Sequence, residues 1–464
     1  MISLHRECEI KKYARGECKK NMAEEKKNMR VTAILGAGVN LEYFDRSEKT
    51  PTTANITKAV VNTSEYIYHD GSKGKIPELI KNVYLHLCAT NPSGALNPDK
   101  SYGEVHFEKI FHILEMLYSY DKIWTKGYNN SSVPLFAHFA TPNFAYNPNQ
   151  IRASLDWMVV LIMDFVEHYN EYFAKHKETE CKWYFDFWNK APFKWDAVNF
   201  NYDTTIEDSL PSFEDGYEGI ENYPDFQRFN PNKLLRSEGH TVNHIHGCIL
   251  YGHHRLKIEE ENKHYIYNYD SHDWYKWRNY ALSKQVWLGT GTDVPNAQNG
   301  DSIYPSPIIT GLNKADKILL LPFSIYRYNL SQKLFQNNAI IIAGYSFGDY
   351  YVNYELERMR LYHGDKLRVV LIDFWSMSDN KDVPIPDMIK AYIEFNEQDG
   401  ISVHKAHFIS KVMQSSHLDY YKDHFNTLTH DNYLISENNQ LMLFVGGWKN
   451  ALKYQDEIYK FLQS

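Results

Sequence analysis

The sequence predicts an α/β fold built on a mainly parallel β-sheet. Short runs of β-branched residues alternate along the chain with longer stretches of helical periodicity, which is the pattern of layered α/β domains. The runs at 339–343 (AIIIA) and 369–372 (VVLI) lack polar alternation, as is typical of parallel strands covered on both faces. Hydrophobic residues make up 43% and charged residues 23% of the 464, an ordinary globular usage that excludes a chain disordered throughout.

The periodicity places each element along the chain. We expect strands at 31–35, 197–200, 244–250, 317–323, 339–343 and 367–372. We expect helices at 76–87, 105–120, 152–177 and 450–462. The helix at 152–177 is the longest and is apolar nearly all round in its first half, which predicts a central position in the fold.

Three regions differ in composition. Residues 1–28 carry eight basic and five acidic side chains with few large apolar ones, which predicts a flexible basic leader; alternatively, Met29 is the natural start of the protein. Residues 29–378 are expected to form the main domain, with a largely helical insertion at about 55–190. Residues 379–464 are expected to form a small mixed C-terminal appendage.

Composition also excludes several classes of protein. Fifty Lys and Arg against 58 Asp and Glu give a net charge of −8, so no overall attraction to nucleic acid is expected. Five cysteines without a CxxC pair argue against a disulfide framework and against a four-thiolate zinc ribbon. The longest apolar run, 157–163, is too short for a membrane span, and the N-terminus lacks an apolar signal-peptide core. We therefore expect a soluble, cytoplasmic protein with no membrane partner.

A glycine turn follows the first strand. Gly36, Ala37 and Gly38 come directly after 31–35, with Val39 and Asn40 next. Such a turn is typical of a Rossmann-like sheet, where glycines let the backbone approach a pyrophosphate. The full GxGxxG pattern is absent, because position 41 is Leu.

Polar residues follow two further strands. Asn201 and Asp203 end the strand at 197–200 and could hold ribose hydroxyls or a water, or they could simply form a turn or helix cap. Alternation along 244–250 puts His244 and His246 on one face. A His-x-His pair can bind metal, but no matching cluster accompanies it in the sequence, so no metal is expected. His246, which precedes Gly247, is the better candidate for a general base, with a structural histidine as the alternative.

A fourth segment, 340–349, is a buried strand that opens into a loop of small residues. The order GAGVN, FNYD, HIHG and GYSFGD, over 31–375, resembles the sirtuin-like NAD-consuming family, particularly its bacterial antiphage-defence branch. The segment 50–53 (TPTT) is similar to the stretch that follows the first loop in that family.

The resemblance implies a role for each matching residue. Asn201 would position the nicotinamide ribose or the attacking water, and His246 would be the general base. Asp203 would support the Asn201 loop. The residues expected to bind the phosphates are Gly36, Ala37, Gly38, Val39 and Asn40, and those expected on the adenosine side are Gly344, Tyr345, Ser346 and Asp373.

The implied activity is NAD⁺ hydrolysis to nicotinamide and ADP-ribose. Deacylating sirtuins carry a zinc ribbon that this chain lacks, which favours water as the acceptor. The resemblance further implies NAD depletion in antiphage defence by abortive infection, with activation by homo-oligomerisation or by an operon-encoded sensor such as a HerA-type ATPase. Two alternatives remain: a sirtuin-like ADP-ribosyl transferase or deacylase, and a non-catalytic nucleotide-sensing module.

Overall fold

A computed structural model describes residues 29–42, 50–67, 71–125, 148–221, 223–252, 255–257, 265–267, 274–287, 304, 306–311, 314–318, 321–374, 403–413 and 432–464. The predicted leader, 1–28, lies outside the described residues. Among the helices of the described part, none is long and apolar enough to cross a membrane.

The centre of the molecule is a seven-stranded sheet, and all but one of its pairings are parallel. The exception is the edge strand β14, which runs antiparallel to β15. This confirms the predicted mainly parallel sheet and is compatible with a Rossmann-like fold. The strands, in spatial order, are β14 (Leu434–Ile435), β15 (Leu441–Phe444), β13 (Arg368–Ile372), β12 (Ala339–Ala343), β1 (Arg30–Leu35), β4 (Lys194–Asn199) and β7 (Thr241–His244).

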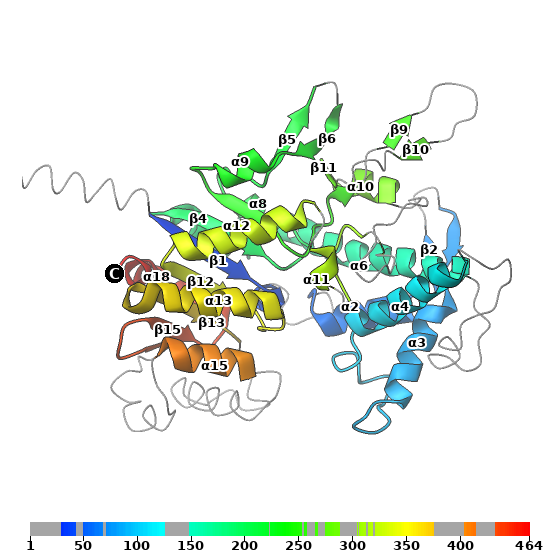
Figure 1. Cartoon of the computed structure of the whole chain (residues 1–464), viewed down its shortest axis with the longest axis horizontal. Helices are drawn as coiled ribbons and strands as arrows, with labels where there is room; N and C mark the ends of the chain where they lie inside the picture. Colours follow the sequence, from blue (N-terminus) through cyan, green and yellow to red (C-terminus); the bar gives the residue numbers. More distant parts are fainter. Residues whose placement is uncertain are drawn as a thin grey trace, which may run out of the picture.

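Helices cover both faces of this sheet (Figure 1). Successive residues of a strand point to opposite faces, and in β12 Ile340 and Ile342 pack on one side while Ile341 packs on the other. The first side is covered by α12 (Phe323–Gln336), α13 (Tyr350–His363) and α15 (Val403–Val412). The second is covered by α7 (Lys182–Lys190), α17 (Trp448–Ala451) and α18 (Gln455–Leu462).

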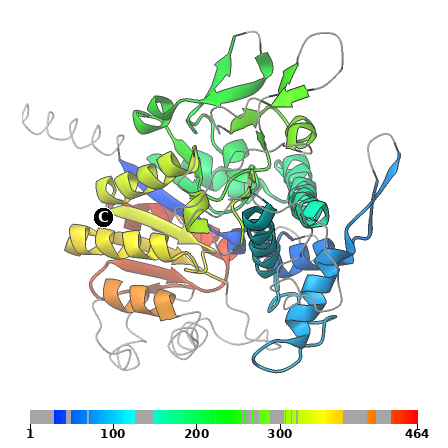
Figure 2. The same cartoon turned by 45° about the vertical axis from the view of Figure 1, so that its right-hand side comes forward.

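A separate group of helices lies beyond the carboxyl ends of the strands (Figure 2). Its members enter the chain between β1 and β4, so this connection is largely helical in the described residues. They pack on one another in a core cluster in which α6 contacts the other three helices, and residues of later segments such as Tyr217 and Tyr326 join the same cluster. The group consists of α2 (Thr53–Asn62), α3 (Glu78–Ala89), α4 (Phe107–Thr125) and α6 (Pro148–His176), with the hairpin β2 (Glu65–Ile67) and β3 (Lys73–Lys75).

A small antiparallel sheet and several short elements complete the described chain. The sheet has the order β5 (Tyr217–Ile220), β6 (Tyr223–Phe229), β11 (Tyr275–Trp277) and β8 (Tyr251–Gly252), and a two-stranded ribbon pairs β9 (Arg255–Lys257) with β10 (Tyr265–Tyr267). The short helices are η1 (Ala37–Glu42), α8 (Thr205–Ser209), α9 (Pro231–Leu235), α10 (Tyr280–Trp287), α11 (Lys314–Lys317), η2 (Gly364–Lys366) and η3 (Leu452–Tyr454).

Two predicted strands are wrong. At 317–323, α11 ends at Lys317 and α12 begins at Phe323. The apolar run between them is too short for periodicity to distinguish strand from helix. At 244–250, β7 ends at His244 and the chain turns at Gly247, whose φ is +89°. His244 and His246 therefore do not share one strand face, as alternation predicted.

The C-terminal segment is not a separate appendage. β15 pairs with β13 in register Val369 to Leu441, and β14 pairs with β15. Without β15, the unpaired edge of β13 would be exposed. All four residues of β15 are buried, so the main domain includes this segment instead of ending near 378.

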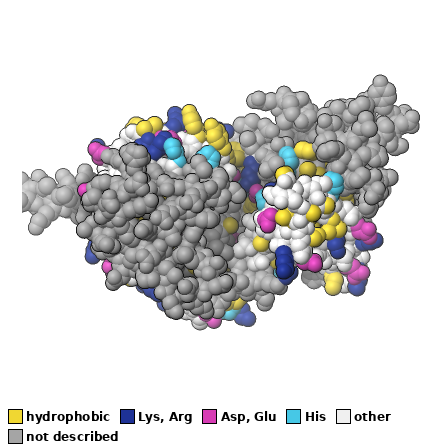
Figure 3. Space-filling model, turned by 90° about the horizontal axis from the view of Figure 1, so that it is seen from below, with side chains coloured by type: hydrophobic (Ala, Val, Ile, Leu, Met, Phe, Trp, Pro, Cys, Tyr) yellow, Lys and Arg dark blue, Asp and Glu magenta, His cyan; other side chains and the backbone are white. Residues whose placement is uncertain are grey.

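The surface carries no large field of one sign in the described residues that face the view from below (Figure 3). Basic, acidic and apolar side chains are interspersed there.

Candidate functional site

The glycine loops after β1 and β12 pack directly on each other. Gly36 N–H donates to Ala343 O at 2.9 Å, and Gly38 N–H donates to Gly344 O at 3.0 Å. A Cβ on Gly38 would lie 2.7 Å from Gly344 Cα, and one on Gly344 would lie 2.3 Å from Val39 N. Gly344 also has a φ of +60°, which side chains disfavour. These glycines are therefore needed for the crossing of two loops, whether or not a phosphate binds there.

The loop after β4 is fixed by its own polar side chains. Asn201 Nδ2 donates to Gly36 O at 3.1 Å, which ties this loop to the glycine turn. Asn201 N–H donates to Asn199 Oδ1 at 2.9 Å. Asp203 Oδ1 accepts from Thr205 N–H at 3.1 Å and from Thr205 Oγ1 at 2.5 Å. Asp203 thus stabilises the turn that leads into α8, whose N-cap residue is Thr204; a turn was one of the structural roles that the sequence left open.

His246 follows β7 and is buried beside Phe200, whose ring it meets edge to face at 5.0 Å between centroids. Its Nε2 lies 3.3 Å from Asp349 Oδ1, an ion-pair distance without hydrogen-bond alignment. Asp349 stands at the N-terminus of α13. The β7 turn and the loop after β12 are therefore brought together by an imidazole and a carboxylate.

Lys314 extends this contact into a chain of ion pairs. Its Nζ lies 3.7 Å from Asp349 Oδ1 and 3.0 Å from Glu108 Oε1. Burial opposes ionisation of Asp349, but its interactions with His246 and Lys314 outweigh this effect and hold the pKa of that carboxyl well below its usual range. Asp349 is thus an anion at neutral pH, placed against the candidate base.

One pocket brings together Asn201, Asp203 and His246, three of the predicted polar residues. About 490 Å³ of space, part of it open to solvent, lies between the sheet ends and the helical group. Its lining residues come from the glycine turn, from α2, α4 and α6, and from the turns after β4 and β7. They are Ala37, Pro51, Thr53, Ile56, Phe107, Glu108, Val166, Phe200, Asn201, Tyr202, Asp203 and His246. Because Pro51 and Thr53 are among them, the TPTT segment reaches the pocket as well.

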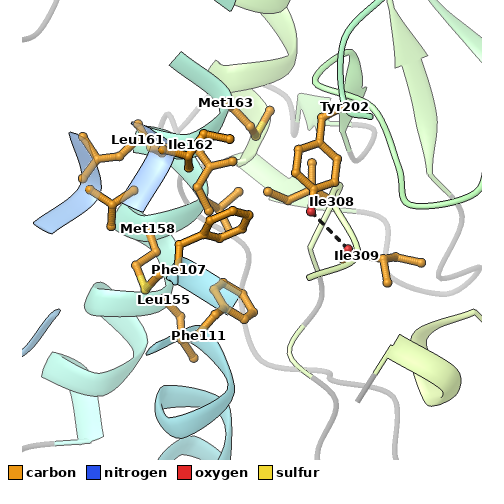
Figure 4. Packing of buried hydrophobic residues seen from close by; sticks show 14 of the residues in the cluster. Phe107, Phe111, Leu155, Met158, Leu161, Ile162, Met163, Tyr202, Ile308 and Ile309 are labelled. Atoms are coloured by element: carbon orange, nitrogen blue, oxygen red, sulfur yellow. Dashed lines mark hydrogen bonds between the residues drawn. The ribbon is translucent and has the colours of Figure 1, made fainter. Parts of the chain in front are cut away.

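The Tyr202 ring packs toward the helical core, with its hydroxyl donating to Ile309 O at 3.3 Å (Figure 4). Phe107 and Met158 belong to the same packed cluster. Tyr202 and Phe107, which both line the pocket, are thus held by the core to which α4 and α6 contribute.

The residues expected on the adenosine side do not line this pocket. Tyr345 is buried, and its ring packs against Phe200 at 4.9 Å between centroids. The carboxylate of Asp373 pairs with Lys405, and it accepts from Phe374 N–H at 2.8 Å. Gly344 lies in the loop contact described above, and Ser346 is exposed at the surface.

Among the expected phosphate-binding residues, Ala37 alone lines the pocket. Gly36 and Gly38 lie in the crossing of the loops, and Val39 is buried in the sheet core. The side chain of Asn40 lies outside the described part. Of the expected phosphate-binding residues whose side chains the structure describes, Ala37 is thus the one placed against this pocket.

Sequence reasoning missed Glu108, Lys314 and Asp349. Asp349 ends the quoted GYSFGD segment, so a local signal existed for it. Glu108 sits in a helical pattern among many charged residues, and Lys314 follows no motif. Only their position around His246 distinguishes them.

A second polar cluster lies behind the pocket. Glu207, His244 and Cys248 each offer a potential metal-ligand atom, and these atoms lie within 4.8 Å of one another. All three residues are buried. This cluster was not predicted from the sequence, because Glu207 and His244 are 37 residues apart.

No protein-family model matches the chain, and no curated protein matches it by sequence.

Proposed function

We propose that this protein hydrolyses NAD⁺ at the bond between nicotinamide and ribose, releasing nicotinamide and ADP-ribose. The observation that supports this best is that Asn201 and His246, from the ends of two neighbouring parallel strands, line one pocket with Ala37 of the glycine turn. In open α/β sheets the carboxyl ends of the strands form the ligand crevice.

The reaction needs little acid catalysis. Nicotinamide leaves as a neutral molecule from a cationic glycoside, while positive charge grows on the ribose. What the protein must supply is a positioned nucleophile and a base. An imidazole takes up a proton at neutral pH, and such general-base catalysis contributes roughly 10²–10⁴-fold in rate.

His246 is the proposed base, and Asp349 is the proposed counter-charge. As the imidazole accepts the proton of the attacking water it becomes a cation, and the carboxylate 3.3 Å away stabilises that cation. Asn201 uses its amide N–H to hold the glycine turn. Its carboxamide oxygen keeps acceptor capacity for a ribose hydroxyl or the attacking water.

The biological role that we propose follows from the resemblance to the antiphage branch of the sirtuin-like family. The protein would deplete NAD on infection, with its activity released by assembly of several copies or by a partner such as a HerA-type ATPase. Transfer of ADP-ribose to another acceptor uses the same bond cleavage and differs in its product. A nucleotide sensor would bind NAD⁺ without cleaving it.

The test is nicotinamide release from NAD⁺, followed by chromatography, together with NAD⁺ binding by calorimetry. Wild type is compared with His246→Ala and with His168→Ala, whose imidazole is exposed on α6. We expect release by wild type and His168→Ala, a loss of roughly 10²-fold or more in His246→Ala, and binding by all three.

Equal rates in wild type and His246→Ala would exclude His246 as the base. Binding without turnover, also in the presence of the neighbouring gene product, would favour the sensor. Absence of NAD⁺ binding by wild type would exclude the proposal.

A further inference from the structure

Three buried donors of different chemistry meet behind the pocket. Glu207 lies on α8, His244 ends β7, and Cys248 follows the turn at Gly247. His244 and Cys248 are fully buried, and Glu207 is 7% exposed. Thiolate, imidazole and carboxylate are together the ligand types of zinc and of other borderline-soft divalent ions.

The cluster leaves polar atoms unsatisfied. His244 Nε2 and Glu207 Oε1 are 2.5 Å apart and share a hydrogen bond. Within the described residues, His244 Nδ1 and Glu207 Oε2 are buried and have no hydrogen-bond partner. A buried polar atom without a partner is destabilising, so two of them in one cluster indicate a missing ligand.

The surrounding charges can accommodate a dication. Lys276 is the nearby cation, with its Nζ 2.5 Å from Asp215 Oδ2 and 3.7 Å from Glu207 Oε1. Asp215 therefore balances Lys276. The negative charges of the Glu207 carboxylate and a Cys248 thiolate are then left to balance one divalent ion, while the imidazole of His244 binds in its neutral form.

We propose that Glu207, His244 and Cys248 bind one divalent metal ion of the zinc class. Tetrahedral zinc keeps neighbouring ligand atoms roughly 3.3–3.8 Å apart, given metal–ligand distances of about 2.0–2.3 Å. The donors, all within 4.8 Å of one another, need to move by ångström-scale shifts to reach this geometry. The 2.5 Å contact between His244 Nε2 and Glu207 Oε1 is too short for two ligands of one ion, so coordination by these atoms replaces their hydrogen bond.

The fourth position is filled by the second oxygen of Glu207 or by a water. Because the three residues are buried, the site is a closed, structural one. The site lies next to two segments that line the pocket, the turn after β7 and the loop after β4. His244 precedes His246 by two residues, and Ile249, which follows Cys248, donates its N–H to Tyr202 O at 3.1 Å. The ion would hold these segments in place from behind and would not touch substrate.

The test is metal content and Co²⁺ spectroscopy on the full chain. Wild type, Cys248→Ser and the control Cys181→Ser are purified with zinc present and passed over chelating resin. Cys181 is a buried cysteine at the start of α7. We expect about one equivalent of zinc in wild type and Cys181→Ser, and a near-complete loss in Cys248→Ser.

Cobalt substitution adds a readout in wild type itself, because a thiolate-to-metal charge-transfer band there reports a cysteine ligand however well the Cys248→Ser variant folds. Co²⁺ added to metal-free wild type is expected to give a thiolate-to-metal charge-transfer band that Cys181→Ser retains and Cys248→Ser lacks. Wild type with neither zinc nor a cobalt band would overturn the proposal, and so would a band that persists in Cys248→Ser. Both readouts are independent of nicotinamide release, so the metal proposal and the proposed activity are tested separately.

Discussion

Replacing Asp196 by Asn tests how a buried carboxylate holds three strands and the end of α12 together. Asp196 is fully buried in β4. It accepts two hydrogen bonds from Arg30 of β1, one of them at 2.8 Å, and one at 2.7 Å from Thr241 of β7. Asn337 Nδ2 donates at 2.9 Å, and Lys333 Nζ of α12 lies 3.6 Å away. Every one of these neighbours is a donor, and an Asn side chain would turn a donor of its own toward them.

The expected loss is large. Removing one charge from a buried, hydrogen-bonded ion pair costs about 3–5 kcal/mol, because the partner stays buried without its counter-charge. At about 2.1 cal/mol/K per residue, the unfolding entropy of a chain of this length is roughly 1 kcal/mol/K, so each 1 kcal/mol of lost stability lowers the melting temperature by about 1 °C. Asp196→Asn should therefore lower the melting temperature by about 3–5 °C.

The sign of the pH dependence is a second check on Asp196. Burial opposes its ionisation, but Arg30 and Lys333 outweigh that effect and lower its pKa. A carboxyl group whose pKa is lower in the folded state than in the unfolded state stabilises the fold at pH values above its unfolded-state pKa. This stabilisation is lost as the pH falls through the folded-state pKa. The gap between wild type and Asp196→Asn should thus be widest near pH 7 and should narrow in acid.

The measurement is thermal unfolding of wild type, Asp196→Asn and a matched control, Asp186→Asn. Asp186 forms surface pairs with Lys182 and Lys190 on α7, so its loss should change stability by about 0.5 kcal/mol or less. If Asp196→Asn melts within 1 °C of wild type, roughly the range expected of the surface control, the Asp196 cluster does not stabilise the sheet as argued.

Three further predictions follow from the same contacts. Asp349→Asn should slow nicotinamide release roughly 10²-fold with NAD⁺ affinity retained; unchanged turnover would show that His246 works without the carboxylate. Gly344→Ala should lower the melting temperature more than Gly364→Ala. Both glycines have a positive φ, but a new Cβ at Gly344 would lie 2.3 Å from a backbone atom, whereas one at Gly364 would have no atom within 4 Å. Equal decreases in melting temperature would mean that backbone strain alone determines the effect. His240→Asn should make the free energy of unfolding less dependent on pH between pH 7 and 4. Burial and then Lys194 lower the pKa of His240 to about 4, so wild type should lose about 1–2 kcal/mol of stability as the pH falls from about 6.5, whereas Asn can still accept the Trp195 N–H that His240 Nδ1 accepts at 3.0 Å. A variant as acid-sensitive as wild type would exclude His240 as the source of that loss.

The strands that the sequence predicted well are those buried on both faces. Residues 339–343 match β12, and 367–372 differs from β13 by one residue. Their continuous apolar runs have no other comfortable place in an α/β fold. The run at 317–323 looks similar, but Pro322 stands within it and Phe323 starts a helix. At that length, tertiary packing decides between strand and helix, and a single sequence does not contain that information.

The candidate site was predictable only where a polar residue directly follows a buried strand. Asn201 and His246 meet that condition, because the topology brings the carboxyl ends of β4 and β7 side by side. Glu108 and Lys314 do not, since they come from a distant helix and from a short helix near residue 315. Their approach to His246 depends on how the helical group docks against the sheet, a long-range arrangement with no local sequence pattern.

The glycine motifs and the polar residues support the proposed function to different degrees. Gly38 and Gly344 are required because a Cβ at either position would lie less than 3 Å from backbone atoms of the other loop. Any protein with this crossing of loops needs glycine there, whatever it binds. His246 has no comparable structural requirement. Asn201 does hold the glycine turn through its amide N–H, but its side chain lines the pocket together with His246. A protein that used this pocket for packing alone would fill it with apolar residues. The case for catalysis therefore rests on the polar pair and on the Asp349 carboxylate beside it, and variants at these three positions test it more directly than variants at any glycine.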